Sequence, residues 1–523
     1  MRKNKKILKN MSYVSLGTIF SRILGYFRDM LVANVFGAGF FADAFYAAFR
    51  IPNLFRRLFG ESSLNAAFVP VLSEYLNTKT KQETEELISA VATVIFVCLS
   101  VLTILGVIFS FPITRVITWG FSKEKLLLAS RLLQIMFPYM LLICLSALGL
   151  SILNCLKIFF IPAASSASLS VSEIIFVLFF VRYLSSKTQI EGLAVSVVVG
   201  GLLQVVINYF VIRKQSYSFK INVKKFFEFL KSEPIQKIGI LFVPVVVGFS
   251  VDQINALVDT FCASFLREGS VTALYYSNRL MQFPLALFGT SLVTVTLPQM
   301  ADEFIGGLQE EMNQTVLHSV RNVIFFLLPA SVGLIVLGRP IIITLFEHGN
   351  FTRQATLMTD SCLMFYSSGL IFFSISKIFV SSFYAMKKNF IPVRIASLCV
   401  VINFILNIVL MKPLKVGGLA LATTITSFIS CILLYHKLKK YTKIKLFTSS
   451  TIKFLLNIAI INLYLVFILI LVRRYVQNNL IITGVGICSG VVVYFILTYL
   501  FKIEETGILV VFVKKIFTFQ KNG

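Results

Sequence analysis

Apolar runs long enough to cross a bilayer recur along the whole chain, separated by short polar stretches rich in lysine and arginine. A transmembrane helix needs about 20 mostly apolar residues, and about fourteen segments meet that length. They are residues 11–37, 42–75, 87–112, 127–154, 159–182, 190–212, 238–266, 272–300, 317–346, 354–385, 390–411, 417–436, 449–472 and 480–501. The pattern predicts an all-α polytopic membrane protein.

Two of these spans contain a proline near the middle of an apolar run. Pro52 lies in the second span and Pro284 in the eighth. A proline has no backbone N–H to donate, and its ring clashes with the carbonyl of the preceding turn. We therefore expect both helices to be kinked or broken at these points, as membrane helices tolerate where neighbouring groups satisfy the backbone.

The chain also repeats itself after about 230 residues. This shift lays LKIFFIPAASS (156–166) over MKKNFIPVRIA (386–396) and places Lys157 on Lys387. It also places Asp29 on Asp259, Ala33 on Ala263 and Tyr46 on Tyr276, and with a two-residue slip Pro52 on Pro284. Charged and proline positions that agree at one shift are not expected from chance similarity between apolar segments.

Each copy of the repeat contains six spans, so both copies begin on the same side of the membrane and form a parallel repeat. We expect two pseudo-symmetric six-helix lobes. The predicted divisions are an N-terminal lobe at 1–214, a basic cytoplasmic linker at 215–237, a C-terminal lobe at 238–436, and two extra transmembrane helices with a cytoplasmic tail at 437–523. Transporters of this design bind substrate between the lobes and expose it alternately to each side.

Composition agrees with this prediction, since 57% of the residues are hydrophobic and the formal net charge is +26. Lysine and arginine concentrate in cytoplasmic loops, and the main basic clusters fall on one side if both termini are cytoplasmic. Attraction to anionic lipid headgroups explains positive charge at a membrane as well. No soluble basic domain suggests nucleic acid binding. The 8 cysteines and 3 histidines stand alone, which predicts neither disulfides nor a metal site.

The first two spans carry charges that are costly in hydrocarbon and should face protein or water. They hold five arginines against two aspartates, and the eighth span adds Arg279. The seven residues are Arg22, Arg28, Asp29, Asp43, Arg50, Arg56 and Arg57. A surplus of positive charge in a partly hydrated cavity favours an anionic ligand, and guanidinium groups suit phosphate. For any single arginine, an ion pair that fixes helix packing, or a side chain that extends to the headgroups, stays open.

The segments SRILGYFRD, FGAG, ADAFYAAFRIPNLFRRLF, AAFVPVLSEY and YYSNRLMQFP resemble the signature segments of the bacterial MurJ/MviN family of lipid II flippases. The resemblance covers roughly residues 10 to 445 in matching order. It implies the fold of the multidrug/oligosaccharidyl-lipid/polysaccharide exporter superfamily, the bacterial inner membrane, and a role in peptidoglycan biosynthesis. The implied substrate is undecaprenyl-pyrophosphate carrying a disaccharide-pentapeptide, and cell-wall synthesis proteins are possible partners.

The resemblance also implies substrate-binding residues. The family's essential arginines fall on Arg22, Arg28, Arg56 and Arg279, and its aspartate falls on Asp43. Asn53 and Glu61 match further polar positions. Where many relatives read ADRLMEFP, this chain has Asn278 and Gln282, which makes the expected cavity more cationic.

A coupling ion is a further expectation. Asp259, Asn403, Asn407 and Thr423 could supply oxygen atoms to sodium, and membrane potential is the other possible driving force. Simple hydrogen bonds between helices explain the same polar residues. Glu173, Asp252 and Lys377 are intramembrane ionisable residues for which the sequence predicts no role.

These observations predict alternating access, with Arg28, Arg56 and Arg279 holding the pyrophosphate. No nucleotide-binding loop or acid–base pair is present, so neither an enzyme activity nor a cofactor is expected. One alternative is a drug/cation antiporter of the same superfamily, against which the arginine surplus argues. Another is a scaffold for a cell-wall complex that transports nothing, in which the arginines would be replaceable.

Overall fold

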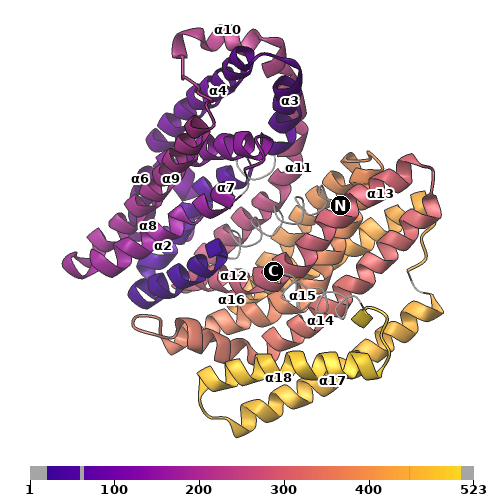
Figure 1. Ribbon diagram of the computed structural model, residues 1–523. Helices are drawn as coiled ribbons and strands as arrows, with labels where there is room; N and C mark the ends of the chain where they lie inside the picture. Colours follow the sequence, from indigo (N-terminus) through magenta and orange to yellow (C-terminus); the bar gives the residue numbers. More distant parts are fainter. Residues whose placement is uncertain (1–19, 59–63, 159, 447, 508–523) are drawn as a thin grey trace, which may run out of the picture. The chain divides into compact units, whose positions relative to one another are not determined.

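The computed structural model describes residues 20–58, 64–158, 160–446 and 448–507 (Figure 1). These ranges contain helices and short connections and no β-strand. They divide into two compact units. Unit 1 takes the described residues up to Thr272 together with Gly349–Phe351, and unit 2 takes Ala273–His348 and the described residues from Thr352 onward. The lobe boundaries predicted from the repeat, which assign residues 238–272 to the second lobe, stay a prediction.

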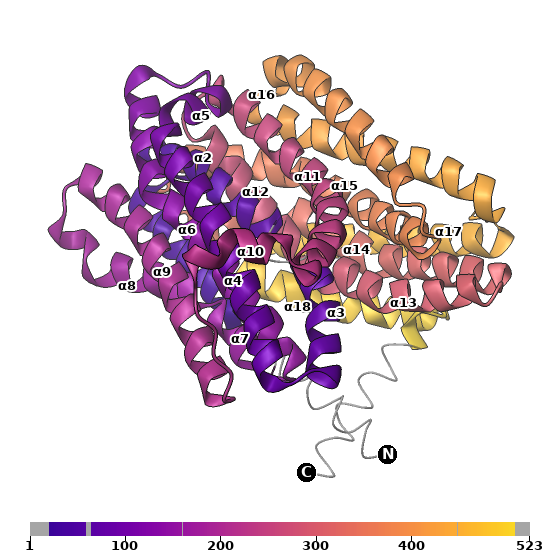
Figure 2. The same ribbon diagram turned by 90° about the horizontal axis from the view of Figure 1, so that it is seen from above.

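Unit 1 begins with a helix at residues 20–36. Its other elements are α2 (Phe40–Phe55), α3 (Leu64–Thr78), α4 (Lys81–Ile108), α5 (Ser110–Ile117), α6 (Lys123–Cys155), α7 (Phe160–Ser165), α8 (Ser168–Phe179), η2 (Val181–Tyr183), α9 (Ser186–Lys214), η3 (Val223–Lys225), α10 (Phe226–Lys231) and α11 (Glu233–Ser264). Helices α8 and α9 pack side by side (Figure 2).

Helix α12 begins at the end of unit 1, and the remaining helices belong to unit 2. They are α12 (Ser270–Pro284), η4 (Leu285–Thr290), α13 (Ser291–Ile305), α14 (Gln309–Phe346), α15 (Arg353–Ala385), α16 (Phe390–Thr442), α17 (Ser449–Tyr475) and α18 (Asn479–Leu500). The closest packing in this unit is between α15 and its neighbours α14 and α16.

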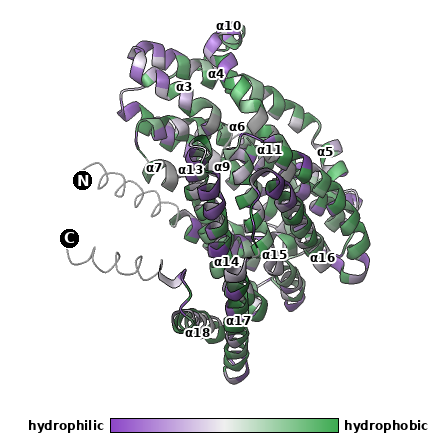
Figure 3. Ribbon diagram, turned by 90° about the vertical axis from the view of Figure 1, so that its right-hand side faces the viewer, coloured by the Kyte–Doolittle hydropathy of each residue, from purple (hydrophilic) through white to green (hydrophobic). Residues whose placement is uncertain are grey.

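Within the described ranges, nine helices are long and apolar enough to cross a membrane, and hydrophobic residues run along them (Figure 3). One of the nine, α16, contains two of the predicted spans, because Lys415 interrupts it with a non-helical backbone (φ 51°, ψ −133°). Wherever its residues are described, each of the fourteen predicted segments lies on a helix. The prediction of an all-α polytopic membrane protein is confirmed.

The two prolines have the predicted effect. A wide π-helical turn at residues 56–58 follows Pro52, and another at Leu285–Thr290 follows Pro284. Because the proline cannot donate to the preceding turn, the helix accommodates it by widening. The second and eighth spans are therefore each built from two helices, α2 with α3 and α12 with α13.

The repeat is visible in how the helices end. Lys157 follows α6 with φ 64°, and its counterpart Lys387 follows α15 with φ 58°. In both places the next residue donates its N–H five residues back, to Leu153 O at 2.9 Å and to Phe383 O at 2.8 Å. The same left-handed residue ends further helices at Ser216, Gly307, Lys443 and Lys502. This is the Schellman type of C-cap, which usually uses glycine.

Burial agrees with the repeat as well. Tyr46 and Tyr276 are both buried, and so are Asp29 and Asp259. In unit 1 a core of aliphatic and aromatic side chains joins α3 and α4 to α6, with Phe68 and Leu72 fully enclosed. Large apolar side chains such as Ile104 and Ile108 remain exposed on the outer side of α4, as expected for a surface that faces lipid.

In unit 2 the last two helices are held on α14 by a buried cation. The Arg321 side chain lies 2.6 Å from a carboxylate oxygen of Glu505 and 3.1 Å from one of Glu504. Its guanidinium carbon is 4.7 Å from the centre of the Phe454 ring in α17. The Tyr494 hydroxyl of α18 donates to the Phe325 carbonyl of α14 at 2.6 Å.

Replacing Arg321 by alanine should therefore loosen this attachment. Removing one partner leaves the buried Glu505 carboxylate uncompensated, which costs ~3–5 kcal/mol in buried pairs. We expect a clearly lower temperature of unfolding for the purified protein. An Arg353→Ala variant, which breaks an exposed pair with Glu347, should cost less than ~1 kcal/mol. Equal small effects of the two variants would contradict the role given to Arg321.

Candidate functional site

Arg28 is held between two carboxylates at the centre of unit 1. Its Nε and Nη2 donate to Asp29 Oδ1 at 3.0 and 2.6 Å, and its Nη1 lies 3.5 Å from Glu173 Oε1 of α8. All three side chains are buried. Glu173, for which the sequence predicted no role, is thus a second partner of this predicted substrate-binding arginine.

Helix α2 brings two other predicted residues together. Arg56 Nε donates to Asn53 Oδ1 at 2.9 Å, at the start of the π-helical turn after Pro52. One turn earlier, Arg50 Nε donates to the Thr260 hydroxyl of α11 at 3.1 Å. The amide and the hydroxyl are neutral, so these contacts orient the guanidinium groups without cancelling their charge.

Asp43 occupies a different environment from the one predicted for a substrate contact. Its side chain is fully enclosed and lies 2.9 Å from Lys125 Nζ of α6. It also accepts the Gly269 N–H at 2.7 Å, the Thr272 N–H at 2.9 Å and the Thr272 hydroxyl at 2.7 Å. Since α12 begins at Ser270, Asp43 caps the N-terminus of that helix, where a negative charge is favoured. A substrate role for Asp43 stays a prediction.

A second contact joins distant segments near the same ends of the helices. The Asn350 N–H donates to Asn34 O at 2.8 Å, and its side-chain amide donates to Val35 O at 2.5 Å. Both flanking glycines are left-handed, Gly37 at φ 61° and Gly349 at φ 56°. A Cβ on Gly37 would lie 2.2 Å from the Asn350 carbonyl oxygen, so no larger residue fits without a shift.

Both contacts link the two copies of the sequence repeat. Asp43 and Asn34 come from the first copy, whereas Thr272 and Asn350 come from the second. Counting spans places the connections after the first and third helices of each copy on one side of the membrane. The two contacts therefore close unit 1 at the side opposite the chain termini.

Positive charge exceeds negative charge around helix 20–36 and α2. Six cations and four carboxylates belong to this described region of unit 1. The cations are Arg22, Arg28, Arg50, Arg56, Arg57 and Lys125, and the carboxylates are Asp29, Asp43, Glu173 and Asp259. The sequence predicted a surplus from five arginines and two aspartates, and the structure keeps its sign while reducing its size.

The two additional partners, Lys125 and Glu173, were missed as parts of the site. Lys125 stands at the polar edge of its predicted span and reads as an ordinary interfacial lysine. Glu173 had the stronger signal, because a lone carboxylate within an apolar run is a functional candidate by default. Its partner could be found only once α8 was seen against helix 20–36.

In unit 2, Arg279 lies in α12 and is partly buried. On the same helix the Gln282 side-chain amide donates to Asn278 Oδ1 at 2.5 Å. The two residues that replace carboxylates of the family pattern thus bond to each other and add no negative charge beside Arg279. Lys377, for which no role was predicted, is exposed on α15.

Three of the predicted ion-coupling residues form a chain of hydrogen bonds in unit 2. Asn407 Nδ2 donates to Asn403 Oδ1 at 3.0 Å, and Asn403 Nδ2 donates to the Thr423 hydroxyl at 3.4 Å. Asp259 is buried and belongs to unit 1. Among the described residues, no group of three or more histidines, cysteines or carboxylates could hold a metal. These bonds fit the interhelical alternative, and a sodium site stays a prediction. Glu61 and the side chain of Asp252 lie outside the described residues.

Comparison with known proteins places this arrangement in a class and then in a family. A solved structure of a multidrug resistance transporter of the MATE family, in its inward-facing conformation, is 13% identical with a TM-score of 0.68. It covers 83% of this chain, and 98% of its own chain is matched. The fold is that of the transporters of the MOP superfamily. The family model for the lipid II flippase MurJ matches residues 32–489. The chain belongs to the MurJ family.

Individual relatives agree with the family model. A probable lipid II flippase MurJ of Buchnera aphidicola from Schizaphis graminum is 37% identical over 474 residues, 90% of this chain and 91% of its own. The corresponding protein of Vibrio cholerae is 36% identical over 447 residues, 83% of each chain. A solved lipid II flippase MurJ in an inward closed conformation is 31% identical with a TM-score of 0.76, covering 93% of this chain and 98% of its own.

Proposed function

We propose that this protein moves lipid II from the cytoplasmic to the outer leaflet of a bacterial inner membrane. The cationic character of helix 20–36 and α2 is the observation that carries the proposal. Lipid II presents a pyrophosphate to its carrier, while its polyprenyl tail can remain in the bilayer. Family membership and the names of the relatives support the same substrate.

Arginine is the side chain suited to this headgroup, because its planar fork donates two parallel hydrogen bonds to phosphate oxygens. We assign the pyrophosphate to Arg28, Arg56 and Arg279, with Arg22 and Asn53 as further contacts. Arg28 is already oriented by Asp29 and Glu173. Those carboxylates hold it in place when the site is empty and oppose the phosphate when it arrives, which favours release.

Transport then proceeds by alternating access. The contacts of Asp43 with Thr272 and of Asn350 with Val35 close the outer side while the headgroup enters from the cytoplasmic side. Release requires these contacts to break and the arginine site to weaken, since a site equally tight in both states shifts no equilibrium. Both termini are cytoplasmic in this proposal, no bond is made or broken, and sodium or the membrane potential supplies the driving force.

The test is rescue of bacteria depleted of their own lipid II flippase. The wild-type chain should restore both growth and lipid II translocation. An Arg28→Ala, Arg279→Ala double variant expressed to the same level should restore neither, whereas an Arg131→Ala variant, which changes an exposed arginine, should behave as wild type. Rescue by the double variant would discard the arginine site. Failure of the wild-type chain, correctly inserted, would discard lipid II as the substrate.

A further inference from the structure

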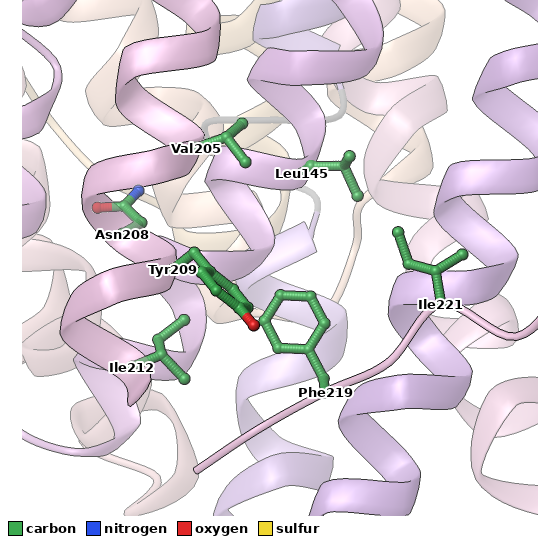
Figure 4. Close-up of a pocket in the computed structure, with 8 residues that line it drawn as sticks. Leu145, Val205, Asn208, Tyr209, Ile212, Phe219 and Ile221 are labelled. Carbon is green, nitrogen blue, oxygen red and sulfur yellow. The ribbon is translucent and has the colours of Figure 1, made fainter. Parts of the chain in front are cut away.

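Away from the arginines, unit 1 encloses an apolar cavity of about 270 Å³ between α6, α9 and the connection that follows α9 (Figure 4). Its wall comes from Leu145 and Gly149 of α6, from one stripe of α9, and from Phe219 and Ile221 of the connection. The α9 residues are Val205, Asn208, Tyr209 and Ile212, whose spacing returns to one helix face.

The connection, residues 217–222, forms a strap tied to α4 at regular intervals. The N–H groups of Ser218, Lys220 and Asn222 donate to side chains of Glu85, Ser89 and Thr93 at 2.9, 3.2 and 3.0 Å. Two residues of extended chain advance about 6.6 Å and four residues of helix about 6 Å, so the two series stay nearly in step. This match turns Phe219 and Ile221 toward the cavity (Figure 4).

The cavity offers an occupant almost no polar partner. Asn208 is the buried polar residue of the wall, but its amide donates to the Ser146 hydroxyl at 2.9 Å and accepts from Ser165 at 3.1 Å. Water needs several polar partners to stay in a buried site. An apolar chain is therefore the favoured occupant, at about 0.8 kcal/mol for each methylene removed from water.

Positive charge borders the open end. The Arg213 guanidinium carbon lies 5.9 Å from the centre of the Tyr209 ring, and Lys220 stands between the two strap residues that line the cavity. From Arg213 back to Val205 the helix rises about 12 Å. A phosphate bound at Arg213 and Lys220 thus places the start of its acyl chain at the cavity mouth.

We propose that this cavity binds one acyl chain of an anionic phospholipid of the surrounding membrane, with its phosphate on Arg213 and Lys220. The lipid is a resident of unit 1, distinct from the transported substrate. It fills the space behind the strap and holds the connection after α9 against α4. This proposal does not depend on the arginines of helix 20–36 and α2, so the two fail independently.

Binding is measured by native mass spectrometry of purified protein titrated with phosphatidylglycerol or phosphatidylcholine of equal chain length. The wild type should prefer phosphatidylglycerol. Arg213→Gln with Lys220→Gln should lower this preference by about 25-fold, at about fivefold for each charge near a membrane surface. Val205→Trp fills the cavity and should abolish binding, whereas Val206→Trp, on the exposed face of the same helix, should not.

A second readout covers a Val205→Trp variant that fails to fold. The chain has one tryptophan, Trp119, so a Trp119→Phe background allows a reporter at Tyr209→Trp. In detergent, brominated phosphatidylglycerol should quench this reporter at lower concentration than brominated phosphatidylcholine. A Phe210→Trp reporter on the exposed face should respond to both alike. Equal quenching at position 209, or displacement of the lipid by a polyprenyl phosphate, would overturn the proposal.

Discussion

An Asp43→Ala variant is expected to lose both transport and much of its stability. The change strands the buried Lys125 ammonium and removes the acceptor that serves the N-terminus of α12. Breaking a buried pair in this way costs ~3–5 kcal/mol, a large fraction of the stability of most folded units. Thermal unfolding of the purified protein and rescue of flippase-depleted cells measure the two effects.

A paired replacement separates this structural role from substrate binding. Asp43→Leu combined with Lys125→Met removes both charges, and replacing a buried pair with apolar residues is often close to neutral for stability. We expect this double variant to unfold near the wild-type temperature and to remain defective in transport, because nothing then caps α12 at the outer closure. Normal stability of the single Asp43→Ala variant, with lost headgroup binding, would instead make Asp43 a ligand residue.

A Glu173→Gln variant is expected to bind the headgroup more tightly and to transport it more slowly. Glu173 lies beside Arg28, so its charge opposes an incoming phosphate. A unit charge about 8 Å away interacts with ~2 kcal/mol at an effective dielectric constant of about 20. We expect the Kd of a short-chain lipid II analogue, measured by titration calorimetry, to fall about tenfold.

The matched control changes the same net charge at a distance. Glu191→Gln neutralises a carboxylate paired with the exposed Arg131, and it should leave both affinity and transport unchanged. Arg28→Lys tests the arginine itself, since an ammonium cannot bridge Asp29 and Glu173 with a planar fork. Weaker binding by Glu173→Gln would mean that Glu173 is needed to position Arg28 rather than to oppose the phosphate.

Much of the fold could be predicted from the sequence because the bilayer imposes strong rules. Length and apolarity locate the spans, and the absence of an N–H on Pro52 and Pro284 located the two broken helices. The repeat was readable since Lys157 and Lys387 keep the same backbone role. What these rules do not contain is which helices pack together.

The candidate site was harder for that reason. The sequence gathered arginines on helix 20–36 and α2, but the partners Glu173 and Lys125 lie on α8 and α6, more than 80 residues away. An aspartate in a cationic segment also reads alike whether it meets a ligand or caps a helix. For Asp43, only the position of the α12 N-terminus distinguishes the two.

The left-handed residues that end the helices have a consequence for how the protein sits in the bilayer. From the fourth span on, each even-numbered span ends in one, and four of the six are lysines, at positions 157, 387, 443 and 502. A lysine in this conformation costs roughly 1 kcal/mol more than glycine. The ammonium fixes the depth of each helix end at the headgroup layer, all on the side predicted to be cytoplasmic. Replacing these lysines by glycine would thus strengthen the turns and leave the helices less firmly placed across the membrane.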